Sequence, residues 1–163
     1  MTDTPISSDS FRSASGLWAT GVSIVTTADG AGKGYGLTMN AVSSLSLDPP
    51  LFLVCLDHKS ETLGPMKESQ AFCINVLTSE QEDLSNRFAK KGPDKFDGVE
   101  WSAAATGAPV IANTLVSIDC AVTQILAGGD HSIVCGEVKY IATNASEGVQ
   151  PLLFFKGRYA ALG

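Results

Sequence analysis

The sequence predicts a mainly β protein, an antiparallel β-barrel with a few helices. Six or more stretches are rich in β-branched and apolar residues, as strands usually are. Short segments with glycine or proline join most of them, which is typical of hairpins. The strands do not alternate regularly with helices, which argues against a doubly wound parallel fold. A barrel is favoured because closure removes the exposed edges of such a sheet.

The first half of the chain predicts one helix and three strands. The helix covers residues 11–19, and Asp9 or Ser10 is its expected N-cap. A loop with three glycines and a turn that ends in two prolines separate the strands that follow. The last of these strands is continuously apolar, which predicts burial on both faces. The predicted strands are 22–27, 35–44 and 51–56.

The second half predicts two short helices and further strands. One irregular helix begins at Ser60, and a clearer one begins at Ser79. Ser79 and Glu82 have the spacing of a capping box, and Gly92 with Pro93 ends this helix. A turn at 128–130 separates two long strands. The predicted strands are 72–77, 116–126, 131–142 and 152–162.

Length and composition limit the domain count and the location. A chain of 163 residues is long enough for one domain with a core. We expect a flexible N-terminal arm over 1–10 and one domain over 11–163. The polar N-terminus lacks a signal pattern, and no apolar run approaches the ~20 residues that span a bilayer. These features predict a cytoplasmic protein that does not enter a membrane.

Charge and cysteine content exclude several classes of partner. The net charge of −6 disfavours binding to nucleic acid or anionic lipid. The low charged fraction, 17%, fits either a homodimer interface or simply a strand-rich protein. No Cys-x-x-Cys pair is present, so we expect buried free thiols and no metal site. The four cysteines are Cys55, Cys73, Cys120 and Cys135.

Two segments have the composition of ligand-binding loops. The glycines between residues 32 and 36 lack the Gly-x-Gly-x-x-Gly spacing of a dinucleotide fold and precede a strand, so we interpret them as a hairpin. The stretch 38–46 gathers short hydroxyl and amide side chains. It is either a solvated strand face with a turn or a polar cradle for a phosphate and a flavin rim. Its polar residues are Thr38, Asn40, Ser43, Ser44 and Ser46.

Several segments, in their shared order, resemble the flavin reductase family, the reductase components of two-component flavin monooxygenases. The resemblance covers roughly residues 11 to 162. It implies a split antiparallel β-barrel that binds FMN or FAD, usually as a homodimer. The matching segments are 11–22, 38–50, 72–77, 81–89, 107–109, 129–131, 136–138 and 151–153.

The resemblance also implies roles for individual residues. The segment 38–46 would wrap the flavin, with Ala41 at a position where family members often carry serine. Asp57, Lys59 and Ser60 would lie near its phosphate, because their segment matches the one that does so in the family. His131 would contact the nicotinamide, and Tyr159 would border the same pocket or serve as a core aromatic. Arg87 and Lys90 would approach the cofactor tail or only place positive charge at a helix C-terminus.

The function implied is hydride transfer from NADH or NADPH to FMN or FAD. The cofactors carry the electronics of this reaction, so no catalytic side chain is expected. The reduced flavin would pass to a separate flavin-dependent oxygenase. The alternatives are a non-catalytic flavin-binding or electron-carrying protein on the same fold and a pyridoxamine-phosphate-oxidase-like enzyme.

Overall fold

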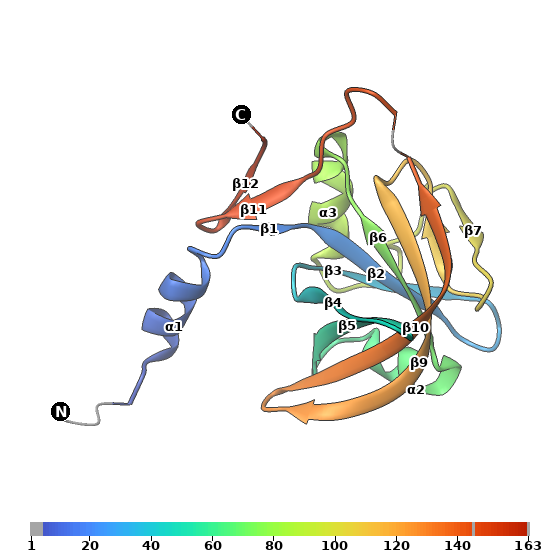
Figure 1. Ribbon diagram of the computed structural model, residues 1–163, viewed down its shortest axis with the longest axis horizontal. Coiled ribbons are helices and arrows are strands. Elements are labelled where there is room, and N and C mark those ends of the chain that lie inside the picture. Colours follow the sequence, from blue (N-terminus) through green and yellow to red (C-terminus); the bar gives the residue numbers. More distant parts are fainter. Residues whose placement is uncertain (1–4, 145, 163) are drawn as a thin grey trace.

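The computed structural model describes residues 5–144 and 146–162. Its centre is a seven-stranded antiparallel sheet with the order β3-β2-β6-β9-β10-β5-β4 (Figure 1). The predicted mainly β, antiparallel class is confirmed. The strands of this sheet are β2 (Ser23–Ala28), β3 (Gly34–Met39), β4 (Val42–Leu47), β5 (Pro50–Asp57), β6 (Ala71–Val76), β9 (Val116–Gly128) and β10 (His131–Thr143).

The sheet curls into a split barrel because its two edge strands are consecutive in the chain. β3 and β4 lie at opposite ends of the strand order, yet only Asn40 and Ala41 connect them. Three residue steps span at most about 11 Å, so the two edges must approach each other. The Cys55 N–H donates to the Ala41 carbonyl at 3.0 Å and fixes the link against β5.

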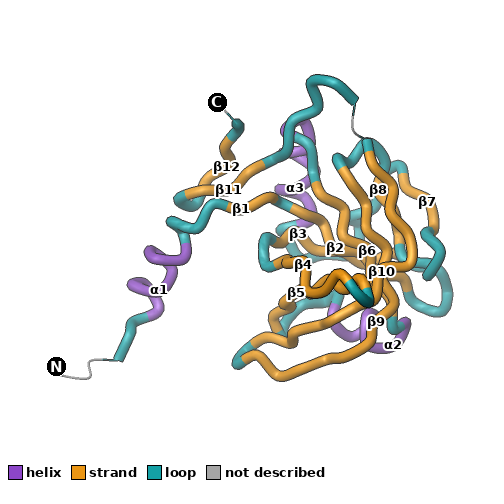
Figure 2. Tube along the Cα trace, viewed as in Figure 1, coloured by secondary structure: helices purple, strands orange, loops and turns teal. Residues whose placement is uncertain are grey.

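The remaining elements surround this sheet, with the helices at its periphery (Figure 2). Within the described residues, no helix is long and apolar enough to span a membrane. Two small sheets complete the fold, one of β1 (Thr20–Gly21), β11 (Leu153–Phe155) and β12 (Arg158–Ala160), the other of β7 (Trp101–Ala103) and β8 (Pro109–Ile111). The helices are α1 (Ser8–Ser15), α2 (Leu63–Ser69), the 3₁₀ turn η1 (Ser79–Gln81) and α3 (Glu82–Phe88).

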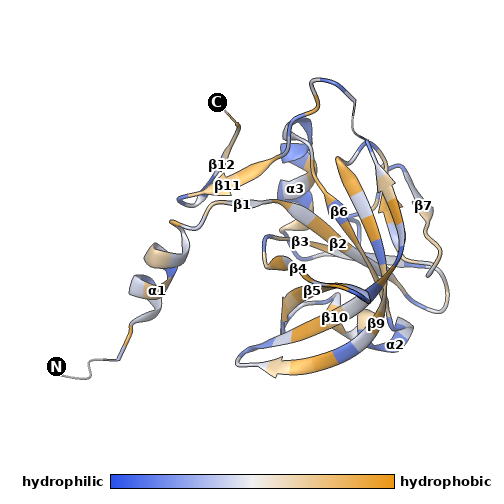
Figure 3. Ribbon diagram, viewed as in Figure 1, coloured by the Kyte–Doolittle hydropathy of each residue, from blue (hydrophilic) through white to orange (hydrophobic). Residues whose placement is uncertain are grey.

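Apolar residues are frequent along the central strands, which Figure 3 colours orange, and they form two core clusters. On β2, Val25 belongs to the larger core cluster with Phe72, whereas Ile24 belongs to a second cluster with Phe88 of α3. Successive side chains of a strand point to opposite faces, so β2 separates the two clusters. Burial on both faces stabilises this strand and explains its unbroken run of apolar and threonine residues.

A buried amide ties four strands together. Asn75 of β6 is fully buried, and its Nδ2 donates to the Ile24 carbonyl and to Thr26 Oγ1, both at 3.1 Å. Its Oδ1 accepts from the Ile111 N–H and from the Ser117 hydroxyl, both at 2.9 Å. A buried amide is tolerated only when its donors and acceptors are paired, as they are here.

The N-terminal helix and the predicted strand 35–44 differ from the sequence interpretation. The helix begins three residues early, because Ser7 is the N-cap and its Oγ accepts the Ser10 N–H at 3.1 Å. Gly16 ends it, so Leu17 to Ala19 are not helical. Of the arm predicted over 1–10, residues 1–4 lie outside the described part of the chain. The predicted strand breaks at the Asn40–Ala41 link, and β4 continues to Leu47 through the expected turn.

The second half also differs from the sequence prediction: α2 begins at Leu63 and not at Ser60, and α3 ends at Phe88, before Gly92. The capping box joins Thr78 and Gln81, not Ser79 and Glu82, because a 3₁₀ turn precedes α3. The predicted strand 152–162 is a hairpin that turns at Lys156 and Gly157, where both residues have positive φ. The short strands β7 and β8 were not predicted, because three residues give no readable periodicity.

Removing the buried amide should destabilise the barrel strongly. We expect Asn75→Ala to lower the free energy of unfolding by about 3–5 kcal/mol, because it leaves several buried donors and acceptors unpaired. For a chain of this size that is a fall in Tm on the order of 10 °C. Differential scanning calorimetry measures it. The control Gln124→Ala, an exposed amide on β9, should change Tm little; equal shifts would contradict the anchoring role of Asn75.

Candidate functional site

A pocket of about 640 Å³ lies between α1 and the strands at the split of the barrel. Figure 1 shows α1 standing apart from the sheet, and β1 leads from it back to the barrel. The volume is in the range of small-molecule and cofactor sites. We call its two sides the strand wall, formed by Asn40, Ala41, Val42, Ser43, Leu53 and Cys55, and the helix wall, formed by Ala14, Ser15, Trp18 and Thr20.

The strand wall follows from strand register. Ser43 of β4 pairs with Leu53 of β5, so the two side chains lie on one face of the sheet. Cys55, two residues further along β5, lies on the same face. Most of these side chains are small, and Asn40 adds an amide beside them. The wall therefore offers a shallow surface with hydrogen-bonding groups at one edge, which fits a flat polar ring system.

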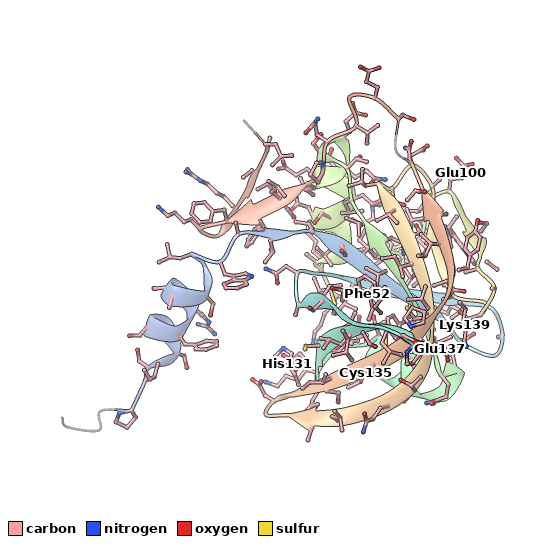
Figure 4. All side chains as sticks on the ribbon, in the orientation of Figure 1. Phe52, Glu100, His131, Cys135, Glu137 and Lys139 are labelled. Carbon is pink, nitrogen blue, oxygen red and sulfur yellow. The ribbon has the colours of Figure 1, made fainter. Side chains whose placement is uncertain are left out.

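The same face continues to the end of β5, where Asp57 pairs with His131 of β10. His131 Nδ1 lies 2.7 Å from Asp130 Oδ1, and the His58 N–H donates to the Asp130 carbonyl at 3.1 Å. The hydrogen bond with His131 lowers the pKa of Asp130 below its usual range. Figure 4 labels His131 and Cys135 along β10. The structure thus brings the predicted phosphate segment and the predicted nicotinamide contact to one place.

The Asp57 segment is a tight turn. The Asp57 carboxylate accepts the Lys59 N–H at 2.7 Å, and Ser60 Oγ accepts the Thr62 N–H at 3.2 Å. These bonds fix the backbone after β5 and leave the Lys59 side chain exposed. An exposed ammonium beside a hydroxyl is suited to a phosphate.

A second pocket of about 220 Å³ adjoins the first and shares Asn40 with it. Thr38 and Tyr159 line it, as does Ala89 at the end of α3. The Thr38 hydroxyl donates to the Ser85 carbonyl at 2.6 Å, and the Tyr159 hydroxyl lies 2.8 Å from Ser85 Oγ. Both predicted residues are therefore held by α3 at the border of the site.

Other predicted residues lie outside these pockets. A register shift between Ser44 and Ser46 disrupts the pairing of β4, and neither residue lines either pocket. Arg87 donates from Nη1 to the Asp97 carbonyl at 2.7 Å and borders a different pocket. Lys90 is exposed just beyond α3. The structure thus ties Arg87 to its own loop and does not bring Arg87 or Lys90 to the strand wall.

The helix wall and half of the strand wall are not among the site residues that the sequence predicts. Leu53 and Cys55 were assigned to a fully buried strand, although the period of two along β5 could have placed them on one face with Asp57. Trp18 and Thr20 were assigned only to a helix and its end. No local pattern links α1 to β4, because the contact arises only from the fold.

Cys55 is the cysteine that lines the pocket. All four cysteines are free, as predicted, and Cys73, Cys120 and Cys135 are buried. Burial raises the pKa of the Cys55 thiol in the strand wall, and the nearby Cys135 raises it further. A protonated thiol is a weak nucleophile, so Cys55 acts as a small wall residue.

The fold and the site define a ligand-binding split barrel with a pocket suited to a flat ring system. Comparison with known proteins gives the family. Residues 15–163 match the model described as flavin reductase like domain. The reductase subunit HsaB of a flavin-dependent monooxygenase from Mycobacterium tuberculosis is 38% identical over 152 residues, 93% of this chain and 81% of that protein.

Two further relatives agree. FMN reductase (NADH) RutF of Pantoea ananatis is 39% identical over 154 residues, 93% of this chain and 80% of that protein. The structure of the NADH:FAD oxidoreductase SgcE6 from Streptomyces globisporus superposes with a TM-score of 0.90 at 31% identity, covering 98% and 96% of the two chains. This chain belongs to the flavin reductase-like family, which confirms the resemblance and the predicted fold.

The strand wall can be tested by two neighbouring serines. We expect Ser43→Leu to raise the Kd for FMN about tenfold or more, because the new side chain fills the pocket; fluorescence titration measures it. Ser44→Leu is the matched control, since Ser44 is exposed and lies outside the pocket. Its Kd should stay within about twofold of wild type, because exposed substitutions away from a site have small effects. Equal weakening by both variants would rule out this wall as the flavin site.

Proposed function

We propose that this protein is a flavin reductase that uses NADH or NADPH to reduce FMN or FAD and supplies the reduced flavin to a separate oxygenase. The carrying observation is the pocket at Asn40–Ser43 in a chain of the flavin reductase-like family, on a sheet face that continues along β5 to Asp57, the strand partner of His131. The relatives named above are a reductase subunit and two reductases that use NADH. The names of these relatives support a flavin and NADH as the cofactors of this protein.

The residues of this chain bind and orient rather than react. A bound flavin supplies the redox chemistry by accepting hydride from the nicotinamide. The Asn40 amide and the Ser43 hydroxyl are positioned to hydrogen-bond a polar ring edge, and the small Ala41 and Cys55 side chains leave room for the ring. Asp130 orients the His131 imidazole, which can hydrogen-bond a carboxamide or a phosphate.

The family match favours a reductase over both alternatives. The matched model describes flavin reductases and not pyridoxamine-phosphate oxidases. A non-catalytic electron carrier would need no second ligand beside the flavin. The convergence of Asp57, Asp130 and His131 at the end of the strand wall supplies a place for one.

We further propose a homodimer in the cytoplasm. Large apolar side chains are exposed at the N-terminus and on β4, among them Ile6 at 78%, Phe11 at 66% and Leu47 at 93%. A second copy that covered them would remove this area from water. The free cysteines fit a reducing compartment. Light scattering at micromolar concentration should give twice the mass of the chain, and a monomer mass would refute the dimer.

Anaerobic reduction tests the activity itself. Mixing the flavin-loaded protein with NADH without oxygen should bleach the flavin absorbance near its visible maximum. An electron carrier without a nicotinamide site should bleach no faster than free flavin. Repeating the experiment with NADPH, and with FMN and FAD, gives the cofactor preference as a ratio of rates.

His131 should affect the nicotinamide more than the flavin. We expect His131→Ala to lower kcat/KM for NADH roughly fivefold to hundredfold, because loss of a hydrogen bond that leaves its partner unpaired costs about 1–3 kcal/mol. The Kd for flavin should change little. Stopped-flow reduction measures the effect, and Leu126→Ala on the neighbouring β9 is the control. If His131→Ala reduced flavin at the wild-type rate at all NADH concentrations, His131 would be an ordinary turn residue with no role in nicotinamide binding.

A further inference from the structure

A buried serine of α3 holds two hydroxyl groups of the smaller pocket, the one of about 220 Å³ that Thr38 and Tyr159 line. Ser85 is fully buried and does not line this pocket itself. Its carbonyl accepts the Thr38 hydroxyl at 2.6 Å, and its Oγ lies 2.8 Å from the Tyr159 hydroxyl. One residue of α3 therefore links β3 and β12, two strands that are distant in the sequence.

The directions of these hydrogen bonds follow from the number of protons available. The Tyr159 hydroxyl donates to Asn86 Oδ1 at 3.2 Å. Because a phenol has only one proton, the Ser85 hydroxyl must be the donor in its bond with Tyr159. Thr38 uses its only hydroxyl proton on the Ser85 carbonyl. Both hydroxyl groups of the smaller pocket are thus left with lone pairs alone.

This polarity limits what the smaller pocket can bind. Asn40 is its third polar side chain, and the rest of the lining is apolar apart from the backbone. A ligand group that only accepts hydrogen bonds would leave both hydroxyl oxygens without a partner, which is costly in a site closed to water. A ligand group with an N–H or O–H is therefore favoured.

The aromatic rings hold α3 in place without help from the Ser85 hydroxyl. The fully buried Phe88 ring lies within 2.9 Å of the point that a Cβ on Gly36 would occupy, so α3 is packed closely on β3. The rings of Phe154 and Tyr159 meet edge to face at 5.6 Å and belong to the same core cluster as Phe88. What the Ser85 hydroxyl adds to this packing is the orientation of the Tyr159 hydroxyl.

We propose that Ser85 is a positioning residue of the reductase, which fixes the Thr38 and Tyr159 hydroxyls as hydrogen-bond acceptors for a donor group of a substrate. This inference rests on the proposed function and extends it, because Ser85 touches no ligand and acts only through two pocket residues. Both substrates of the proposed reaction carry N–H donors. The Kd for FMN and the KM for NADH are therefore measured separately, and the one that rises identifies the substrate concerned.

A double-mutant cycle tests whether Ser85 acts through Tyr159. We expect Ser85→Ala and Tyr159→Phe each to raise the affected constant about threefold to tenfold, since each removes one oriented hydrogen bond. The double variant should be no weaker than the weaker single variant, because the two hydroxyls act as a unit. Fluorescence titration gives the Kd for FMN, and steady-state kinetics should show the change in KM with kcat little altered.

A variant at an exposed position separates orientation from stability. Asn86 is exposed, so Asn86→Ala should leave Tm within about 2 °C of wild type. It removes the acceptor that directs the Tyr159 proton, and we expect the same constant to rise about threefold. Ser69→Ala on α2 is the matched control, because Ser69 Oγ also lies 2.8 Å from a hydroxyl, that of Thr27, and lines neither pocket. It should leave both constants within about twofold of wild type, whatever its Tm.

Two results would overturn the role of Ser85. The first is a lower Tm for Ser85→Ala with an unchanged Kd for FMN and KM for NADH, together with unchanged constants in Asn86→Ala. The second is a double variant whose fold-change is the product of the two single changes, which would show that Ser85 does not act through Tyr159. If Ser85→Ala does not fold, Asn86→Ala and Tyr159→Phe decide in the same way. Failure of the proposed function is distinct from these results, because the wild type itself would then not bind flavin or not be bleached by NADH.

Discussion

The two-residue link between β3 and β4 is the constraint on which both the barrel and its pocket depend. A flat seven-stranded sheet would hold its edge strands tens of ångströms apart, since neighbouring strands are about 4.8 Å apart. Asn40 and Ala41 hold those edges together, so the sheet must close. The same two residues line the candidate site. The backbone that forces closure therefore also presents the amide and the small side chain that a ligand meets.

Closure of the barrel requires that its strands pass very close to the aromatic side chains of the interior. Gly136 of β10 lies where an added Cβ would come within 2.6 Å of the Phe72 ring, so only glycine lets β10 pass over that side chain. Gly36 of β3 does the same for Phe88, 2.9 Å from its would-be Cβ. The second contact brings α3 close to β3. It thereby positions Ser85 to accept the Thr38 hydroxyl at the edge of the smaller pocket.

Local patterns predicted the parts of the fold that repeat over many residues. The two long strands β9 and β10 and their turn were predicted closely, because alternation over a dozen residues is a strong signal. The break at Asn40–Ala41 was missed, since hydroxyl and apolar residues continue through it without a glycine or proline. For the site, the sequence predicted the polar segment, of which Asn40, Ala41 and Ser43 line the pocket, whereas the role of His131 stays a prediction. It could not predict Trp18 and Thr20, because α1 and β4 meet only after the sheet has curled.

In the proposed function, the uncharged lining of the pocket favours a flavin that binds reversibly and dissociates after reduction. The ten residues that line it, all within the described part of the chain, include no charged side chain. Recognition there rests on shape, stacking and neutral hydrogen bonds, whereas the charged groups Asp57, Lys59 and the Asp130–His131 pair gather at its end. A reduced flavin is more negatively charged than the oxidised form. In the proposed function, the lining offers no fixed cation that would retain this charge, so release of the reduced flavin to a separate oxygenase is favoured over tight retention.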